Sequence, residues 1–260
     1  MRDVWQRRID RASELAAHDE SIRPLLEVYG RLLTLQRGCS ESLDRQAARL
    51  SGSLERDLAI LVPVVPRVLQ EVAAIGPPPL GDAARELIDG GPGSIAPMLL
   101  AGWRTPSDED FFARIILQPY ASCLASHQRP PLDRDPPRGT QACPFCAGAP
   151  QVSILEHASG SDGGGRSLLC GTCFTTWPVR RVLCVACGEE DERKLGYFHS
   201  PAIDHLRVDA CDTCRRYVKS VDLTRLGLAE PLVDEVAGAA LDIWAQERGY
   251  EKLALNLVGL

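Results

Sequence analysis

The chain carries Cys143-Pro-Phe-Cys146 and, further on, Arg166-Ser-Leu-Leu-Cys-Gly-Thr-Cys173, and both stretches return 41 residues later. The second copies are Cys184-Val-Ala-Cys187 and Arg207-Val-Asp-Ala-Cys-Asp-Thr-Cys214. The arginine, the threonine and all four cysteines of each copy therefore keep a constant offset. A repeat of this kind predicts two copies of one small structural unit.

Each copy has the spacing of a four-sulfur metal site. A CxxC turn presents two thiolates to one ion from a single loop, and a second such turn about twenty residues on completes a tetrahedral site. The residues between the turns suffice for a short β-hairpin. We therefore predict two tandem metal ribbons that together hold two metal ions. The predicted ligands are Cys143, Cys146, Cys170 and Cys173 for one ion, and Cys184, Cys187, Cys211 and Cys214 for the other.

The rest of the chain favours helix. Apolar residues recur at roughly helical spacing through residues 1–127, which we expect to form an α-helical domain. Four prolines interspersed with charges make residues 128–140 an extended linker. We expect the first ribbon over 141–180, the second over 181–222 and a C-terminal helical segment over 223–260, with one helix from about Pro231 to Glu247.

Apolar stretches between the CxxC turns are the expected hairpin strands. They are residues 151–155 and 167–169 in the first ribbon, and 195–200 and 206–209 in the second. The predicted fold class is α+β, with an N-terminal α-helical domain followed by two tandem four-cysteine units of the zinc-ribbon kind and a C-terminal helix.

Composition places the chain among soluble globular proteins, with 45% hydrophobic and 25% charged residues. Pro, Gly or a charged residue interrupts every apolar run before about 18 residues, so we expect no membrane insertion. The first residues lack the apolar stretch of a signal peptide. We therefore expect a cytoplasmic location, where cysteines stay reduced and CxxC clusters serve metal sites more often than disulfides.

The charge of the ribbon region disfavours nucleic acid as a partner. Residues 136–220 hold ten Lys or Arg and nine Asp or Glu. Each four-thiolate site with a divalent ion adds two negative charges, which brings the region to about −3. A surface of this charge binds phosphate poorly.

Several features beyond the cysteines resemble the formate dehydrogenase accessory protein family. The resemblance covers nearly the whole chain, and its specific motifs lie between about residues 143 and 256. They are the CPxC turn with Pro150 after it, Trp177, Arg181-Val-x-Cys184, Leu195-x-Tyr197, Tyr217-x-Lys219, Asp234-Glu235, Leu241-Asp242, Glu247-x-Gly249-Tyr250 and Asn256. The chain departs from the family pattern at Ala147, where Gly is usual, at Glu235, where a second aspartate is usual, and at Leu257, where proline is usual.

The resemblance implies a function. Members of that family are rubredoxin-like iron-binding proteins of the cytoplasm that act as assembly factors for the catalytic subunit of molybdenum-dependent formate dehydrogenase before its export. The implied partner is therefore this catalytic subunit rather than a small substrate. Spacing alone favours zinc in the two sites, whereas the resemblance implies iron; four sulfur ligands suit either metal.

Seven further residues are candidate contacts for the partner, and each also has a structural interpretation. Trp177 can pack over the first metal site, and Arg181 can pair with nearby negative charge. Tyr217 and Lys219 can cap the second ribbon. First-turn acids of a helix also interact favourably with its dipole. The seven candidates are Trp177, Arg181, Tyr217, Lys219, Asp234, Glu235 and Asp242.

Three classes of function remain open from the sequence. A non-enzymatic assembly factor is the leading hypothesis, because no Ser-His-Asp arrangement, Walker loop or paired-carboxylate motif is readable and the five histidines are scattered. A zinc-ribbon regulatory or nucleic-acid-binding protein is the alternative. A rubredoxin-like electron-transfer protein is a third, and it requires iron.

Overall fold

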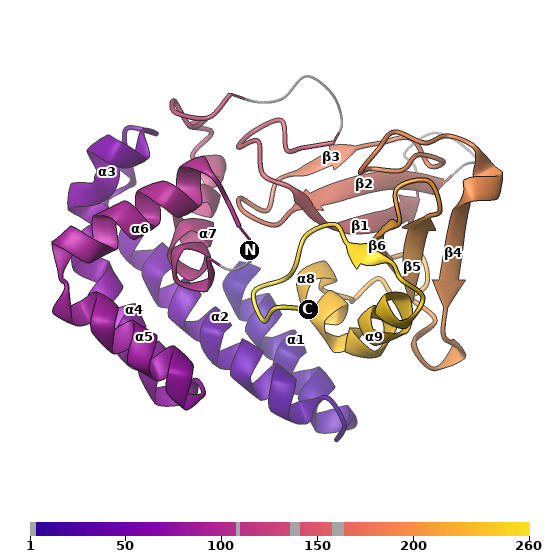
Figure 1. Cartoon of the computed structure of the whole chain (residues 1–260), viewed down its shortest axis with the longest axis horizontal. Coiled ribbons are helices and arrows are strands. Elements are labelled where there is room, and N and C mark those ends of the chain that lie inside the picture. The colour runs from indigo at the N-terminus through magenta and orange to yellow at the C-terminus, as the bar shows by residue number, and fades with distance from the viewer. Residues whose placement is uncertain (1–3, 108–109, 136–140, 158–163) are drawn as a thin grey trace. The chain divides into compact units, whose positions relative to one another are not determined.

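The computed structural model describes residues 4–107, 110–135, 141–157 and 164–260. The chain divides into two compact units, each described here by itself (Figure 1). The helical unit comprises Met1–Asp135 with Thr172–Phe174, and the sheet unit comprises Pro136–Gly171 with Thr175–Leu260. The α+β class predicted from the sequence is confirmed, while the bounds of the five predicted segments stay predictions.

Helix α7 is the centre of the helical unit. It runs from Phe111 to Ser126 and buries ten residues, with Ile115 and Tyr120 fully enclosed. Helix α6 approaches it closely, because a Cβ atom on Gly102 would stand only 2.4 Å from the Cβ of Ala113 on α7. The other elements are α1 (Val4–His18), α2 (Arg23–Asp44), η1 (Ala47–Arg49), α3 (Leu54–Leu61), η2 (Val62–Val64), α4 (Val65–Ile75), α5 (Pro78–Asp89) and α6 (Pro92–Arg104).

One segment combines high mean hydropathy with the interruptions that the sequence analysis expected, among them Pro63 and Pro66. Leu54–Ile75 has the length and the mean hydropathy, 1.8, of a membrane span, and it alone passes that test among the described residues. Core helices of soluble proteins pass the same test, so length and composition alone do not identify a membrane span. In this structure η2 separates the segment into α3 and α4, and buried side chains such as Leu61 and Leu69 line the core of the helical unit.

The sheet unit contains one seven-stranded sheet in which the two predicted ribbons are joined. The first ribbon supplies β1 (Pro150–His157), β2 (Gly164–Cys170) and β3 (Thr176–Pro178). The second supplies β4 (Leu195–His199), β5 (Leu206–Cys211) and β6 (Arg216–Asp222). The strand order is β3-β2-β1-β6-β5-β4, and β7 (Glu251–Lys252) pairs with β6. Short 3₁₀ turns, η3 (Glu192–Lys194) and η4 (Pro201–Ile203), flank β4.

The repeat seen in the sequence is visible in this order. Each ribbon is an antiparallel sheet in which its middle strand, β2 or β5, pairs with both of its neighbours. The first strand of one ribbon then pairs in parallel with the last strand of the other, with Val152 opposite Lys219 and Leu155 opposite Asp222. The four predicted hairpin strands are confirmed, and the sheet continues from one copy into the next.

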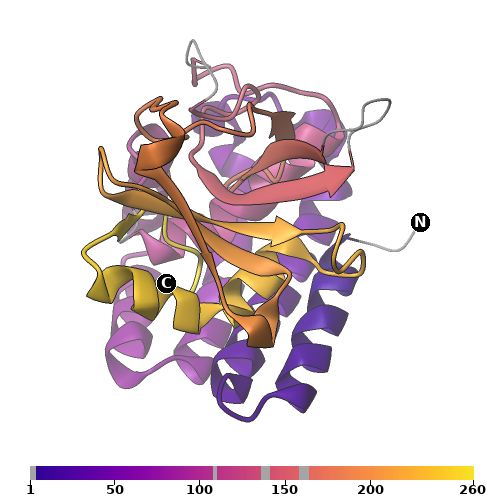
Figure 2. The same ribbon diagram turned by 90° about the vertical axis from the view of Figure 1, so that its right-hand side faces the viewer.

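The C-terminal segment covers this sheet with two helices instead of the single one that the sequence predicted. They are α8 (Pro231–Ala237) and α9 (Ala239–Glu247), and Gly238 separates them. Helix α8 contacts β1 and β6, and α9 contacts β5 (Figure 2). A Cβ atom on Gly238 would stand 2.9 Å from the Leu206 side chain, so the chain between the two helices runs close to the sheet.

Candidate metal centres

The eight cysteines of the repeat gather into the two groups of four that the sequence predicted. The four sulfur atoms of each group lie within 4.8 Å of one another. The Sγ–Sγ distances include 3.5 Å between Cys146 and Cys170, and 3.7 Å between Cys184 and Cys214. Four thiolates about 2.3 Å from a central zinc ion stand about 3.8 Å from one another. The donor set and its spacing therefore fit a tetrahedral metal ion, of zinc or of iron.

Every CxxC turn is closed by a residue in the left-handed region of backbone conformation. The residue after the second cysteine has φ of 58° at Ala147, 62° at Phe174, 80° at Gly188 and 59° at Arg215. In three of the turns its backbone N–H donates to the carbonyl of the first cysteine at 2.9 Å. This conformation turns the chain sharply enough to aim two sulfur atoms at one point, although it disfavours residues other than glycine.

The two centres differ in their exposure to solvent. The cysteines of the first centre are all buried, none of them above 2% exposed. In the second centre Cys184 and Cys211 are buried, whereas Cys214 is half-buried and Cys187 is exposed. Equivalent positions in the repeat therefore have different surroundings, and Cys187 is the exposed counterpart of Cys146.

A cluster of charged side chains lies buried beneath α8 and α9. Lys219 on β6 and Lys252 on β7 face Glu235 on α8 and Asp242 on α9, and no side chain among these four is more than 1% exposed. The Lys219 Nζ atom lies 2.9 Å from Glu235 Oε1, and Lys252 Nζ lies 3.1 Å from Asp242 Oδ1. Lys219 also pairs with Asp242, and Lys252 with Glu235. Two cations and two anions make the cluster neutral overall.

Neutral side chains complete the hydrogen bonding of this cluster. The Tyr217 hydroxyl donates to Asp242 at 2.8 Å, and the amide of Asn256 donates to Glu235 at 3.0 Å. Burial by itself would raise the pKa of Glu235, but the ammonium groups of Lys219 and Lys252 outweigh it and hold the pKa at about 2. Burial would likewise lower the pKa of Lys219, and the two carboxylates raise it instead. Glu235 and Lys219 therefore stabilise each other as ions, whereas burial outweighs the carboxylates at Lys252 and lowers the pKa of that residue.

Comparison with known proteins relates the C-terminal part of the chain to one family. Residues 182–258, which include the second centre and the buried charge cluster, match the family model described as FdhE, C-terminal domain. The C-terminal part of the chain therefore resembles the FdhE family. It is similar to the Protein FdhE homolog of Aquifex aeolicus, with 38% identity over 117 residues that make up 45% of this chain and 41% of that protein. The Protein FdhE homolog of Pseudomonas putida is 37% identical over 129 residues, 47% of this chain and 40% of that one.

These alignments span only about two fifths of the length of the curated FdhE homologues. A similarity in fold extends much further. The crystal structure of the FdhE protein from Pseudomonas aeruginosa superposes with a TM-score of 0.69 and covers 99% of this chain and 96% of that chain. At 22% sequence identity this likeness establishes a shared fold and nothing finer. The FdhE resemblance drawn from the sequence is confirmed.

The structure places most of the seven candidate partner contacts inside this FdhE fold. Tyr217, Lys219, Glu235 and Asp242 belong to the buried charge cluster. Asp234 accepts from the backbone N–H of Glu230 at the start of α8 and contacts His205 at 2.9 Å. Trp177 is buried in β3, and Arg181 is exposed. A direct role of these residues in partner binding stays a prediction. Six of the seven side chains are enclosed in the conformation described here.

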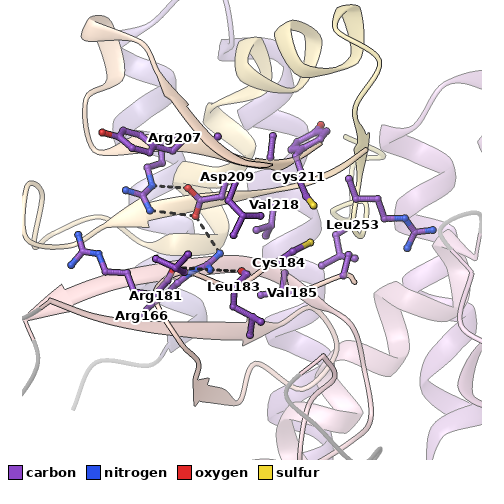
Figure 3. A pocket seen from close by; sticks show the side chains of 18 of the residues that line it. Arg166, Arg181, Leu183, Cys184, Val185, Arg207, Asp209, Cys211, Val218 and Leu253 are labelled. Carbon is purple, nitrogen blue, oxygen red and sulfur yellow. Dashed lines mark hydrogen bonds and ion pairs between the residues drawn. The ribbon is translucent and has the colours of Figure 1, made fainter. Parts of the chain in front are cut away.

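A polar cavity of about 530 Å³ lies within the sheet unit, against the second centre (Figure 3). Cys184 and Cys211 line it, together with the side chains of Arg166, Arg207 and Asp209. The two arginines are equivalent in the repeat, and both contact Asp209: Arg166 at 3.2 Å through Nη2 and Arg207 at 2.8 Å through Nε. The repeat aligns the two arginines in the sequence, but the sequence carries no signal that they meet at one carboxylate.

The helical unit holds one further group of possible ligand atoms. Asp44, Cys123 and His127 bring a carboxylate, a thiol and an imidazole within 4.8 Å of one another. The His127 Nδ1 atom lies 3.0 Å from the backbone carbonyl of Cys123, which is a cap at the end of α7, and 3.8 Å from the Cys123 sulfur. Because the cap accounts for the position of the ring, we assign this group a structural role. Cys39 is also buried.

Proposed function

We propose that this chain is a non-enzymatic accessory factor that binds the catalytic subunit of a molybdenum-dependent formate dehydrogenase in the cytoplasm and supports its maturation before export. One observation supports this proposal most strongly. The residues that match the FdhE C-terminal domain include the second four-cysteine centre and the buried charge cluster. The first four-cysteine centre, just before the matched residues, supports the same interpretation.

The geometry supports a protein that presents a rigid surface. Thiolates of the two centres would hold one metal ion each, and a bound ion would fix the four turns that carry them; iron would in addition be able to change valence. The buried cluster ties α8 and α9 to β6 and β7 through four ion pairs. Metal at the turns and charge beneath the helices would thus stabilise the same sheet. A surface of this kind suits recognition of a folded or partly folded protein.

Capture from the cell tests the proposal. The tagged chain is purified from its own cytoplasm after anaerobic growth, and the proteins that accompany it are identified by mass spectrometry. We expect the catalytic subunit of a formate dehydrogenase, in its immature form. Recovery of ribosomal or transcription components that survive nuclease treatment would overturn the proposal in favour of a nucleic-acid-related role.

A variant provides the matched control for this capture. Cys39→Ala removes a buried thiol of the helical unit that lies outside both centres, and it should leave the capture intact. Cys211→Ala removes a buried ligand of the second centre, and it should abolish recovery of the subunit. Equal recovery with both variants would contradict a role for the metal centres in binding.

A further inference from the structure

The two four-cysteine centres are equivalent in sequence but not in accessibility. We propose that the second centre is an exchangeable metal site that takes up and releases a thiophilic divalent ion through Cys187, whereas the first centre retains its ion. This inference rests on the metal ligation included in the proposed function, and it does not depend on the identity of the partner.

The first centre is closed by its own surroundings. Its four cysteines are at most 2% exposed. The turn that carries Cys170 is fastened to the residue that precedes β1, since the N–H of Gly171 donates to the carbonyl of Ala149 at 3.1 Å. A Cβ atom on Gly171 would stand only 3.1 Å from the side chain of Gln151, so little space remains beside the turn. An incoming ligand would reach these sulfur atoms only after local opening of the sheet.

The second centre is open on two sides. On the outside, Cys187 and the Gly188 that follows it are both exposed, and Cys214 is half-buried. On the inside, Cys184 and Cys211 line the cavity of about 530 Å³. An incoming donor thus has a solvent path to one thiolate and a cavity beside two others.

Accessibility determines the order of ligand substitution. Cys187 is the cysteine that solvent and small donors contact first, so the metal–Sγ bond of Cys187 breaks while the bond to the incoming donor forms. When the donor is a thiol, its proton passes to the freed Cys187 thiolate, and the number of thiolates on the ion stays the same. Burial prevents the same substitution at Cys146, the equivalent position in the first repeat.

The repeat supplies a matched pair of variants for the test. Protein loaded with zinc is mixed with an excess of the chromophoric chelator 4-(2-pyridylazo)resorcinol, and zinc release is followed by absorbance. The wild type should release one ion per chain rapidly and one slowly, with rates at least about tenfold apart, because release from the first centre requires local opening. Cys187→Ser should lack the fast phase, and Cys146→Ser should lack the slow one.

Two results would contradict exchange at the second centre. Release of both ions at one rate, or loss of the fast phase in Cys146→Ser, would overturn the inference. Because a cysteine variant can fail to fold, wild-type protein is also treated with iodoacetamide without denaturant and its modified cysteines are mapped. Cys187 should react first; modification of the first centre at the same rate would also contradict the inference.

The tests of exchange and of function fail in different ways. A chain that binds no zinc in either centre refutes the ligation on which both proposals rest. A chain that binds two ions and releases them at one rate refutes exchange alone, and the capture of the formate dehydrogenase subunit is unaffected by that result.

Discussion

At the scale of single residues, the four CxxC turns show how a constant motif tolerates different side chains. The left-handed position after each turn is occupied by glycine only once, at Gly188, and by Ala147, Phe174 and Arg215 elsewhere. The sequence comparison marked Ala147 as a departure from the family, and the structure gives the reason that glycine is usual there. A Cβ atom in this conformation lies close to the backbone and costs about 1–2 kcal/mol.

Exchanging alanine and glycine at the left-handed position of two equivalent turns tests this cost. Ala147→Gly should raise the free energy of unfolding by about 1 kcal/mol, and Gly188→Ala should lower it by a similar amount. A Cβ atom on Gly188 would meet only the side chain of Gln141, at an ordinary 3.8 Å, so strain and not crowding is tested. Urea unfolding of the zinc-loaded proteins measures both. A loss of stability in Ala147→Gly would contradict the explanation.

The equivalent arginines of the repeat offer a second comparison at this scale. Arg166 has a 4% exposed side chain that bonds Ser153, the carbonyl of Leu183 and Asp209, whereas Arg207 is 22% exposed. Arg166→Met should lower the free energy of unfolding by about 3 kcal/mol, because it leaves buried acceptors without a donor.

Arg207→Met is the matched control. Asp209 keeps Arg166 and the hydroxyl of Ser220 in that variant, so the loss should be about 1 kcal/mol. Chemical denaturation measures the free energy of unfolding of both variants. Equal losses would show that the difference in burial does not determine how much each arginine contributes to stability.

At the scale of elements, two features could not be predicted from the sequence. They are the parallel pairing of β1 with β6 and the buried charge cluster. The hairpin strands between cysteines could be predicted, because apolar runs lay between recognisable turns. Strand β6 could not, since it buries both faces and carries Lys219 and Ser220 among its apolar residues, so no alternation is visible. Glu235 resembles a surface acid near a helix start, and only its distant partners on β6 and β7 reveal that it is buried.

The charge cluster predicts a pH dependence. Because the pKa of Glu235 falls from its ordinary value of 4.5 to about 2 on folding, its ionised form stabilises the native state. That contribution is complete above about pH 4.5 and is lost as the pH falls through 2. Glu235→Gln should therefore lose about 3 kcal/mol of unfolding free energy at pH 7, where it leaves a buried ammonium group with one counter-ion fewer.

Comparison with the wild type isolates this effect from acid release of metal, which both proteins share. The difference in unfolding free energy between the wild type and Glu235→Gln should shrink steadily from pH 5 towards pH 2. A difference that is constant with pH would show that the carboxylate of Glu235 is not held ionised by the two lysines.

At the scale of the whole molecule, the chain combines a helical unit with a sheet unit that carries seven of the eight cysteines of the two centres; the eighth, Cys173, lies in the segment Thr172–Phe174 of the helical unit. Metal binding and folding are coupled where ligands come from turns that lack a large core. The two units should therefore respond differently to loss of metal.

Replacement of one ligand tests this division. Cys170→Ser should halve the metal content measured by plasma mass spectrometry, because the second group of four cysteines is complete without it. The circular dichroism signal of the helical unit should persist. Loss of both ions together would show that the joined sheet makes metal binding cooperative across β1 and β6.

The central claim is the proposal that this chain binds a formate dehydrogenase catalytic subunit. Calorimetric titration of the purified metal-loaded chain into the purified immature subunit tests it most directly. We predict saturable binding by the loaded chain and its loss after the metal has been removed with a chelator. Absence of binding by the metal-loaded chain to the folded, immature subunit would contradict the account.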